Sequence, residues 1–164
     1  MSKIRIDIAS QTLDLLNEKG ASIRRYPIST AKNGAGELQG SYQTPRGKHV
    51  IRAKIGAGQP VNAVFVGRRP TGEIYTPQLG EQFPDRDWIL TRILWLSGCE
   101  VGYNRLGCVD TMRRFIYIHG SPEEAKMGIP ASHGCVRMRN EDIADLFERI
   151  EPGTPVEILE SVIL

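Results

Sequence analysis

RFIYIHG, residues 114–120, is the stretch that most directly predicts the fold. β-Branched and aromatic side chains dominate it, and such side chains favour the pleated surface of a β-sheet. Gly120 ends the run because a glycine interrupts the pattern of large side chains. The stretch is therefore predicted to be a β-strand that carries His119 at its end.

Further strands and turns are predicted on both sides of this stretch. The 17 glycines and 10 prolines punctuate the chain in a rhythm typical of strands joined by turns. Apolar and polar residues alternate over residues 4–8 and continue over 11–16, which predicts an opening hairpin. Residues 88–96 fit either a strand pair or a short helix, and we favour strand. Other strands are expected at residues 23–29, 48–53, 61–67 and 156–159.

One helix is predicted, close to the C-terminus. Asn140 is a good N-cap, and Glu141 and Asp142 follow it in the first turn, where the helix dipole favours acidic side chains. Pro152-Gly153 ends the helix. Its apolar face has helical spacing and consists of Ile143, Leu146, Phe147 and Ile150. The sequence thus predicts a mainly β, sandwich-like or barrel-like fold with one docked α-helix near the C-terminus.

The composition is that of an ordinary globular domain. Hydrophobic residues make up 40% and charged residues 24% of the chain, so neither a disordered nor a membrane-embedded protein is favoured. Lysine and arginine exceed aspartate and glutamate by only 21 to 19, and no long basic run alternates with aromatic residues, so no nucleic-acid partner is expected. We expect residues 1–164 to form a single domain without a cofactor or metal.

The N-terminal residues predict the compartment. Residues 1–8 contain no apolar stretch and no small-residue cleavage site, so no export signal is visible. We therefore expect a cytoplasmic protein, in which the three cysteines stay reduced. A chain trimmed of a signal peptide would look the same, and such a protein would act in the periplasm.

The chemistry concentrates in residues 118–120 and in ASHGCVRM, residues 131–138. A thiol is a strong nucleophile only as the thiolate, so Cys135 needs a base nearby. His133 is too close in sequence to meet it squarely on an extended segment, whereas His119 can arrive from a neighbouring strand. Gly134 allows close approach, so the amides of Gly134 and Cys135 could point at the oxyanion of an attacked carbonyl.

At these residues the sequence resembles the YkuD-like L,D-transpeptidase family. The family signature is a His followed some fifteen residues later by Ser/Thr-His-Gly-Cys, an apolar residue, and Arg or Asn, and it is matched here by His119 and residues 132–137. The resemblance extends weakly to the turn at residues 44–47 and to residues 153–156. His49 departs from the family pattern, which usually has an aromatic residue there, and we expect it to be structural.

The resemblance implies a role for each matching residue. Cys135 would be the nucleophile, His119 its general base, and the Gly120 carbonyl the group that orients the imidazole. Ser132 and His133 would shape the site. The implied fold is that of the L,D-transpeptidase catalytic domain.

The resemblance also implies the substrate and the inhibitors. Arg137 is suited to hold a substrate carboxylate, because its guanidinium presents paired donors. The donor would be a murein tetrapeptide, with D-alanine leaving and a thioester remaining on Cys135. Water as acceptor gives L,D-carboxypeptidase action, which suits muropeptide recycling in the cytoplasm. An amine acceptor gives 3→3 cross-links or D-amino acid exchange in the periplasm. Carbapenem-type β-lactams are expected to acylate Cys135.

Two other classes of protein are alternatives. One is a zinc protein, although the possible ligands lack the close spacing of a structural zinc site. The other is a wall-binding module that keeps the fold without turnover, although such a module would be expected to lose the Cys or His first. Cys99 and Cys108 are expected to be inert packing residues. The possible zinc ligands are Cys99, Cys108, His119, His133 and Cys135.

Overall fold

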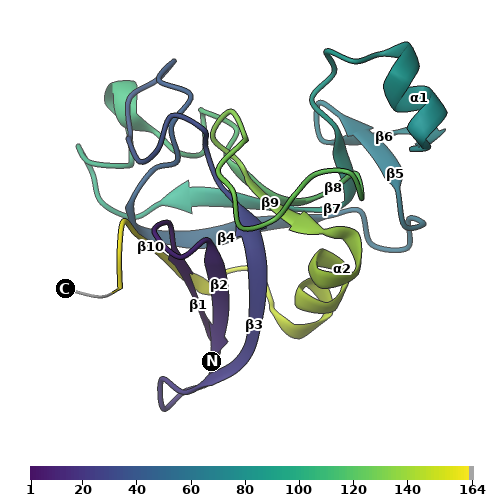
Figure 1. Cartoon of the computed structure of the whole chain (residues 1–164). Helices are drawn as coiled ribbons and strands as arrows, with labels where there is room; N and C mark the ends of the chain where they lie inside the picture. The colour runs from purple at the N-terminus through teal and green to yellow at the C-terminus, as the bar shows by residue number, and fades with distance from the viewer. Residues whose placement is uncertain (163–164) are drawn as a thin grey trace.

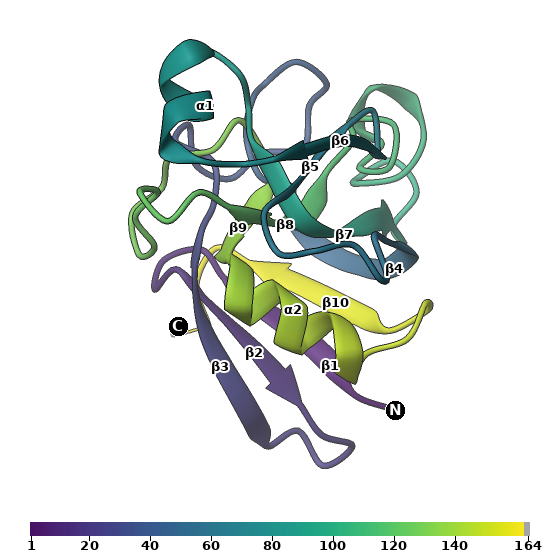
Figure 2. The same ribbon diagram turned by 90° about the vertical axis from the view of Figure 1, so that its right-hand side faces the viewer.

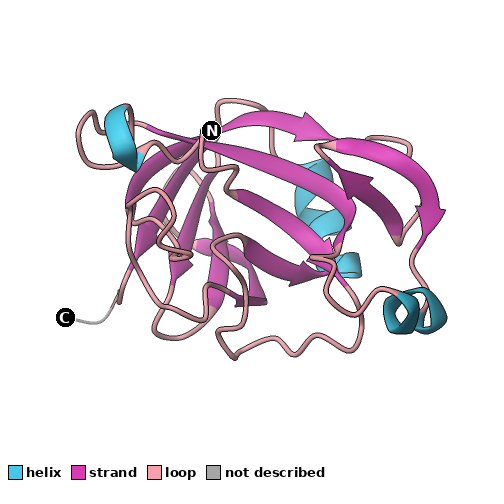
Figure 3. Cartoon of the chain, turned by 90° about the horizontal axis from the view of Figure 1, so that it is seen from above, coloured by secondary structure: helices cyan, strands magenta, loops and turns pink. Residues whose placement is uncertain are grey.

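The computed structural model describes residues 1–162, which form mainly β-strands joined by loops and a few short helices (Figure 3). The strands are β1 (Lys3–Asp7), β2 (Thr12–Leu16), β3 (Ser22–Ser29), β4 (Gly47–Ile55), β5 (Ala63–Val66), β6 (Arg69–Ile74), β7 (Ile89–Gly98), β8 (Tyr117–Ser121), β9 (Val136–Arg139) and β10 (Pro155–Leu159). The helices are α1 (Pro77–Gln82), α2 (Asn140–Arg149) and the short 3-10 helix η1 (Gly107–Val109). None of the helices in this part of the chain is long and apolar enough to cross a membrane.

Eight of the strands form a closed barrel. They follow the order β4-β10-β1-β2-β3-β9-β8-β7, and pairing of β7 with β4 closes the ring. Two neighbouring pairs, β1 with β10 and β8 with β9, are parallel, and the other pairs are antiparallel. The predicted mainly β, barrel-like fold with a helix docked near the C-terminus is confirmed.

The core fills the barrel and extends to α2. In β1, alternation buries Ile4 and Ile6 fully and leaves Arg5 partly exposed. Burying one such side chain stabilises the fold by about 1.5–3 kcal/mol. Helix α2 packs against β7, β8 and β9 (Figure 2). It adds its predicted apolar face to the same core: Ile143, Leu146, Phe147 and Ile150.

A bulge in β7 separates the barrel from a hairpin. One edge of β7 pairs with β8, and the other pairs first with β5, at Ile89 and Leu90, and then with β4 from Ile93 onward. The register shifts between Leu90 and Ile93, where Thr91 has a φ of +74°. The hairpin of β5 and β6, followed by α1, therefore leaves the barrel at this point, away from β1 and β2 (Figure 1).

Asn140 does not cap α2 as predicted. The cap position belongs to Arg139, whose side chain makes no capping hydrogen bond, and Asn140 is the first helical residue. Its buried amide instead accepts a 2.6 Å hydrogen bond from the Thr91 hydroxyl and donates one of 2.8 Å to the Asn62 side chain. The prediction was wrong because these buried partners at the β7 bulge compete for the amide.

Strand β6 and helix α1 were not predicted. Both are largely exposed, so neither carries a buried face that would leave an apolar period in the sequence. The expected strand at residues 61–67 is shorter in the structure, at residues 63–66, because a turn to β6 follows directly. The preference for strand over helix at residues 88–96 is confirmed by β7.

His49 is structural, as expected. Its side chain is 1% exposed, with Nδ1 3.0 Å from the Gly47 carbonyl oxygen and Nε2 3.0 Å from the Thr111 hydroxyl. A carbonyl only accepts, so Nδ1 carries the proton and Nε2 accepts from Thr111. Burial lowers the pKa of His49 to about 4, against the opposing hydrogen bond to Gly47. The folded protein therefore holds this imidazole neutral.

This burial predicts a loss of stability in mild acid. The unfolded chain takes up a proton on His49 near pH 6.5, whereas the folded chain does so only near pH 4, so the unfolded state binds more protons between these values. We expect the free energy of unfolding to fall as pH drops below 6.5, with a smaller slope in His49→Gln by up to about 1.4 kcal/mol per pH unit. Urea unfolding at several pH values measures this, and identical slopes in the two proteins would contradict it.

Candidate active site

The site is assembled where β8 and β9 run side by side. Their parallel register sets Ile118 opposite Val136 and His119 opposite Arg137. Cys135 is the residue just before β9, at the end of a tight turn. Cys135 Sγ contacts the Tyr117 N–H, and Tyr117 lies two residues before His119 on the same strand.

The site lies on the outer face of the barrel wall. Ile118 and Val136 point into the barrel core, so alternation turns Tyr117 and His119 to the opposite face. A second hydrophobic cluster lies outside the barrel core, and the half-buried Cys135 packs against it. The buried members of that cluster are Tyr117 with Ala63 and Phe65 of the hairpin and Ile93 of β7. The reactive groups are thus enclosed between the barrel and the β5–β6 hairpin.

The imidazole of His119 is held in one tautomer. The side chain is fully buried, and its Nδ1 lies 2.6 Å from the Gly120 carbonyl oxygen. Because a carbonyl only accepts, the ring proton is on Nδ1 and the lone pair is on Nε2. Nε2 has no hydrogen-bond partner among the described residues. Burial lowers the pKa of His119 despite the nearby Asp87 carboxylate, so the ring is neutral.

Gly120 is required by close packing as well as by its carbonyl. A Cβ at this position would lie 2.6 Å from the Leu90 carbonyl oxygen and would overlap the Asn140 side chain. The absence of a side chain lets β8 approach the β7 bulge closely. The residue that orients His119 is therefore fixed by its neighbours on two elements.

The Cys135 thiol is held by the backbone of the chain leading into β8. Its Sγ accepts a 3.3 Å hydrogen bond from the Tyr117 N–H, and its S–H donates to the Phe115 carbonyl oxygen at 3.4 Å. Desolvation raises the pKa of the Cys135 thiol to about 12, and the hydrogen bond from Tyr117 offsets part of this effect. Burial therefore favours the neutral form of both the Cys135 thiol and the His119 imidazole.

The turn before Cys135 is closed by Ser132. The Ser132 hydroxyl donates to the Cys135 carbonyl oxygen at 2.6 Å and accepts from the Gly134 N–H at 3.2 Å. The Thr44 hydroxyl donates to the Gly134 carbonyl oxygen at 3.0 Å. The Gly134 N–H thus donates within the turn in this structure, whereas it was expected to face a substrate oxygen. The Cys135 amide stays a predicted oxyanion donor.

Gly134 adopts a conformation that other residues rarely reach. Its φ is +136°, and an added Cβ would lie 3.1 Å from the Ile116 side chain and 3.3 Å from the Gln43 carbonyl oxygen. Both the backbone angle and the space favour glycine. This explains why the turn that presents Cys135 has a glycine at this position.

A cavity of about 370 Å³ opens beside Cys135. Arg68 and Arg114 line it, and neither was singled out in the sequence. His133 is also on its wall, with an exposed side chain whose ring meets that of Tyr42 edge-on at 5.9 Å. His119 is fully buried and does not line this cavity.

Comparison with known proteins places the chain in a family. The family model described as the L,D-transpeptidase catalytic domain, YkuD, matches residues 2–158. The chain belongs to this family. The resemblance seen at the His119 and Cys135 motifs is thereby confirmed over nearly the whole chain.

Members of the L,D-transpeptidase family are similar in sequence and in fold. The probable L,D-transpeptidase YbiS of Escherichia coli K12 is 44% identical over 129 residues, which cover 73% of this chain and 41% of that protein. This chain therefore spans less than half of that relative. An L,D-transpeptidase from Mycobacterium smegmatis has a TM-score of 0.56 at 20% identity, over 96% of this chain and 58% of that one. L,D-transpeptidase 3 from Mycobacterium tuberculosis, solved with a faropenem-derived adduct, has a TM-score of 0.59 at 17% identity, over 97% and 60%.

Arg137 is not among the residues that line the cavity beside Cys135. One of its Nη atoms is 3.4 Å from an Asp87 carboxylate oxygen, and it lines a neighbouring cavity of about 510 Å³ with Arg86 and Trp88. Asp87, the ion-pair partner of Arg137, lines the cavity beside Cys135, and Trp88 lines the neighbouring one. The expected role of Arg137 toward a substrate carboxylate stays a prediction for this L,D-transpeptidase domain.

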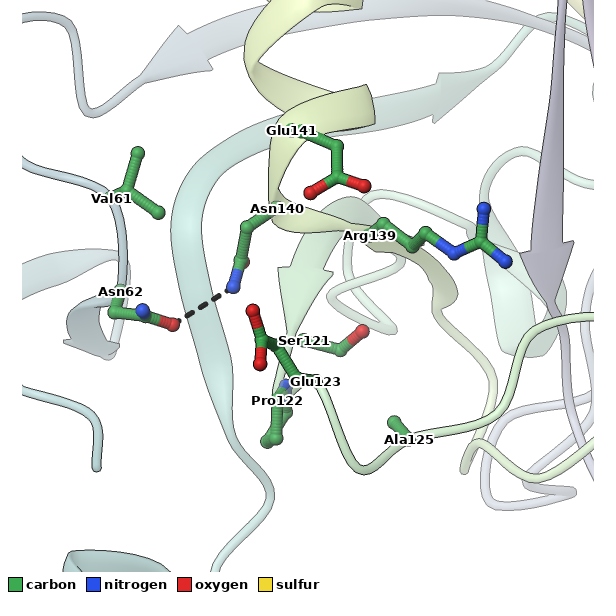
Figure 4. A pocket seen from close by; sticks show the side chains of 9 residues that line it. All are labelled: Val61, Asn62, Ser121, Pro122, Glu123, Ala125, Arg139, Asn140 and Glu141. Carbon is green, nitrogen blue, oxygen red and sulfur yellow. Dashed lines mark hydrogen bonds between the residues drawn. The ribbon is translucent and has the colours of Figure 1, made fainter. Parts of the chain in front are cut away.

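A third cavity lies farther along β8 and does not include the reactive pair. Its volume is about 520 Å³, and it opens beside the hydrogen bond between Asn62 and Asn140 (Figure 4). Glu123 and Glu141 face it together with Arg139. Neither Cys135 nor His119 lines it, so the larger volume does not identify the site.

The other two cysteines were expected to be packed and are not. Cys99 and Cys108 are free and exposed, because both belong to the surface loops between β7 and β8. Among residues 1–162, no group of three or more His, Cys, Asp or Glu side chains is arranged to hold a metal ion. The zinc alternative therefore has no assembled ligand set in the described structure.

Proposed function

We propose that this domain is a cysteine acyl-transfer enzyme of peptidoglycan metabolism. It would cleave the bond between the L-centre of diaminopimelate and D-alanine in murein tetrapeptides. The observation that carries the proposal is the 2.6 Å hydrogen bond from His119 Nδ1 to the Gly120 carbonyl, which leaves an unprotonated, unpartnered Nε2 on the same strand as the backbone that holds Cys135. Family membership supports it.

The reaction would start from the neutral pair. His119 Nε2 takes the proton of the Cys135 thiol as Sγ attacks the carbonyl carbon, so no free thiolate has to form in a desolvated site. The Cys135 amide would donate to the developing oxyanion. The imidazolium then protonates the amine of D-alanine as the C–N bond breaks, and a thioester remains on Cys135.

The acceptor decides the product. Water, activated by the same Nε2, releases a tripeptide and restores the thiol, and we propose this L,D-carboxypeptidase reaction as the main one. An amine acceptor would instead give a 3→3 cross-link or a D-amino acid exchange. The cytoplasmic location stays a prediction, and a periplasmic location would favour the amine acceptor.

Incubation with a disaccharide tetrapeptide separates these outcomes. We expect loss of D-alanine alone by mass spectrometry, both with and without an added D-amino acid. Cys135→Ala should retain the melting temperature and lose turnover by at least about a thousandfold, because the reaction then has no nucleophile. Exchanged or dimeric products would favour the transpeptidase, and turnover by Cys135→Ala would refute the mechanism.

The acid limb of the pH profile tests the neutral base. Burial lowers the pKa of His119 below its ordinary value of 6.5, and only the neutral ring accepts the thiol proton. We therefore expect the acid limb of kcat/KM to have its midpoint below pH 6.5. A midpoint of the acid limb at or above 6.5 would show that the imidazole is not held neutral by burial.

Carbapenem-type β-lactams are proposed as inhibitors. Ring opening of a β-lactam by Cys135 is the same attack on a carbonyl, with no leaving group to diffuse away. The Mycobacterium tuberculosis neighbour carries a faropenem-derived adduct, which supports the proposal. Intact mass should rise by one inhibitor in the wild-type chain and not in Cys135→Ala. Equal labelling of both chains would place the reaction elsewhere.

A further inference from the structure

The cavity beside Cys135 presents cations that face few anions. Arg68 and Arg114 line it, and Asp87 is the carboxylate on its wall. Asp87 lies 3.4 Å from an Arg137 nitrogen, so its charge is already shared with a third arginine. Arginines therefore outnumber carboxylates on the lining of this cavity, which suits an anionic ligand.

The guanidinium of Arg114 hydrogen-bonds to the loop at residues 36–43. Its Nη2 donates to the Gln43 carbonyl oxygen at 2.6 Å and to the Ser41 hydroxyl at 3.2 Å, while Nη1 donates to the Gly36 carbonyl oxygen at 3.3 Å. These acceptors take up both ends of its fork. Arg114 thus anchors residues 36–43 and is not available as a ligand-binding fork.

Arg68 differs because it is held in place without being neutralised. It lies 4.5 Å from the ring centroid of Trp95 and 5.0 Å from that of Phe115, and its Nη1 donates to the Tyr117 hydroxyl at 2.9 Å. Stacking on aromatic faces restrains a guanidinium while leaving its in-plane donors open. Within residues 1–162, Arg68 makes no ion pair.

The backbone also fixes Arg68. It follows Gly67 at the tip of the β5–β6 hairpin, where Val66 pairs with Arg69, and both central residues have positive φ, +57° and +64°. Such a two-residue turn is the tight kind that matches the twist of paired strands. The Arg68 side chain therefore extends from a rigid hairpin, so little conformational entropy is lost when it binds a ligand.

Tyr117 couples this cation to the nucleophile. Its backbone N–H donates to Cys135 Sγ, and its hydroxyl accepts from Arg68. Phe115 also contacts both groups. Its carbonyl oxygen accepts a hydrogen bond from the Cys135 thiol, and its ring lies against the Arg68 guanidinium. Thiol and guanidinium are thus positioned by the same two residues at one cavity.

We propose that Arg68, and not Arg137, binds the C-terminal carboxylate of the acyl donor. This inference rests on the proposed function, in which that carboxylate belongs to the departing D-alanine, one residue beyond the attacked carbonyl. A guanidinium with open in-plane donors matches a carboxylate in a two-bond arrangement. Arg68 would thereby select peptides that end one residue after the scissile bond, because a longer or amidated donor lacks the anion at this place.

The first test uses probes that do not depend on the peptide. Iodoacetate carries a carboxylate and iodoacetamide is neutral, so the ratio of their rates at Cys135 reports an anion site beside the thiol. The chain should carry Cys99→Ser and Cys108→Ser, since both of these thiols are exposed. We expect Arg68→Gln to lower the iodoacetate-to-iodoacetamide ratio about ten- to a hundredfold, as for a lost hydrogen bond to a charged group.

Matched variants assign the effect to one side chain. Arg68→Lys keeps the charge without the fork and should fall between wild type and Arg68→Gln. Arg69→Gln removes the exposed neighbouring charge and should leave the ratio unchanged. An unchanged ratio in Arg68→Gln, or a fall in Arg137→Gln of the same size, would overturn the proposal.

The second test uses the donor itself. Wild type should cleave a tetrapeptide with a free C-terminal carboxylate about ten- to a hundredfold better in kcat/KM than its C-terminal amide, and Arg68→Gln should abolish this preference. A preference that survives in Arg68→Gln would overturn the assignment. If the alkylation ratio depends on Arg68 but no tetrapeptide is cleaved, the anion site stands and the proposed function fails.

Discussion

The parallel pairing of β8 with β9 is the constraint on which the site depends. It sets the strand that carries His119 beside the strand that begins after Cys135. The barrel core anchors both strands through Ile118 and Val136, so their outer faces are fixed. A shift of β8 by one residue in this register would turn His119 into the core. The chemistry of the outer face is therefore a consequence of packing on the inner face.

The β7 bulge provides the second layer of the site. At Thr91 the strand changes partner from β4 to β5, which lets the hairpin fold over the outer face of the barrel. The Thr91 hydroxyl binds the Asn140 side chain at the start of α2. Gly120 fits against the same place. The β5–β6 hairpin, helix α2 and the strand that carries His119 therefore all meet at the β7 bulge.

Local signals allowed part of this to be predicted from the sequence. The motif around Cys135, the strand that ends at His119 and the apolar face of α2 are each contained in a short stretch, so their spacing alone was informative. Arg68 could not be found in this way, because its position depends on a hairpin whose outer strand is exposed and patternless. Asn140 was misassigned for a related reason, since its partners Asn62 and Thr91 are remote in sequence.

The tautomer of His119 is the most direct test of this account. Nitrogen-15 NMR of the imidazole at about pH 7, assigned with His119→Gln as reference, distinguishes the three protonation states. The account predicts a neutral ring with the proton on Nδ1, since the Gly120 carbonyl only accepts. An imidazolium, or a neutral ring protonated on Nε2, would contradict the account, because neither could take the thiol proton.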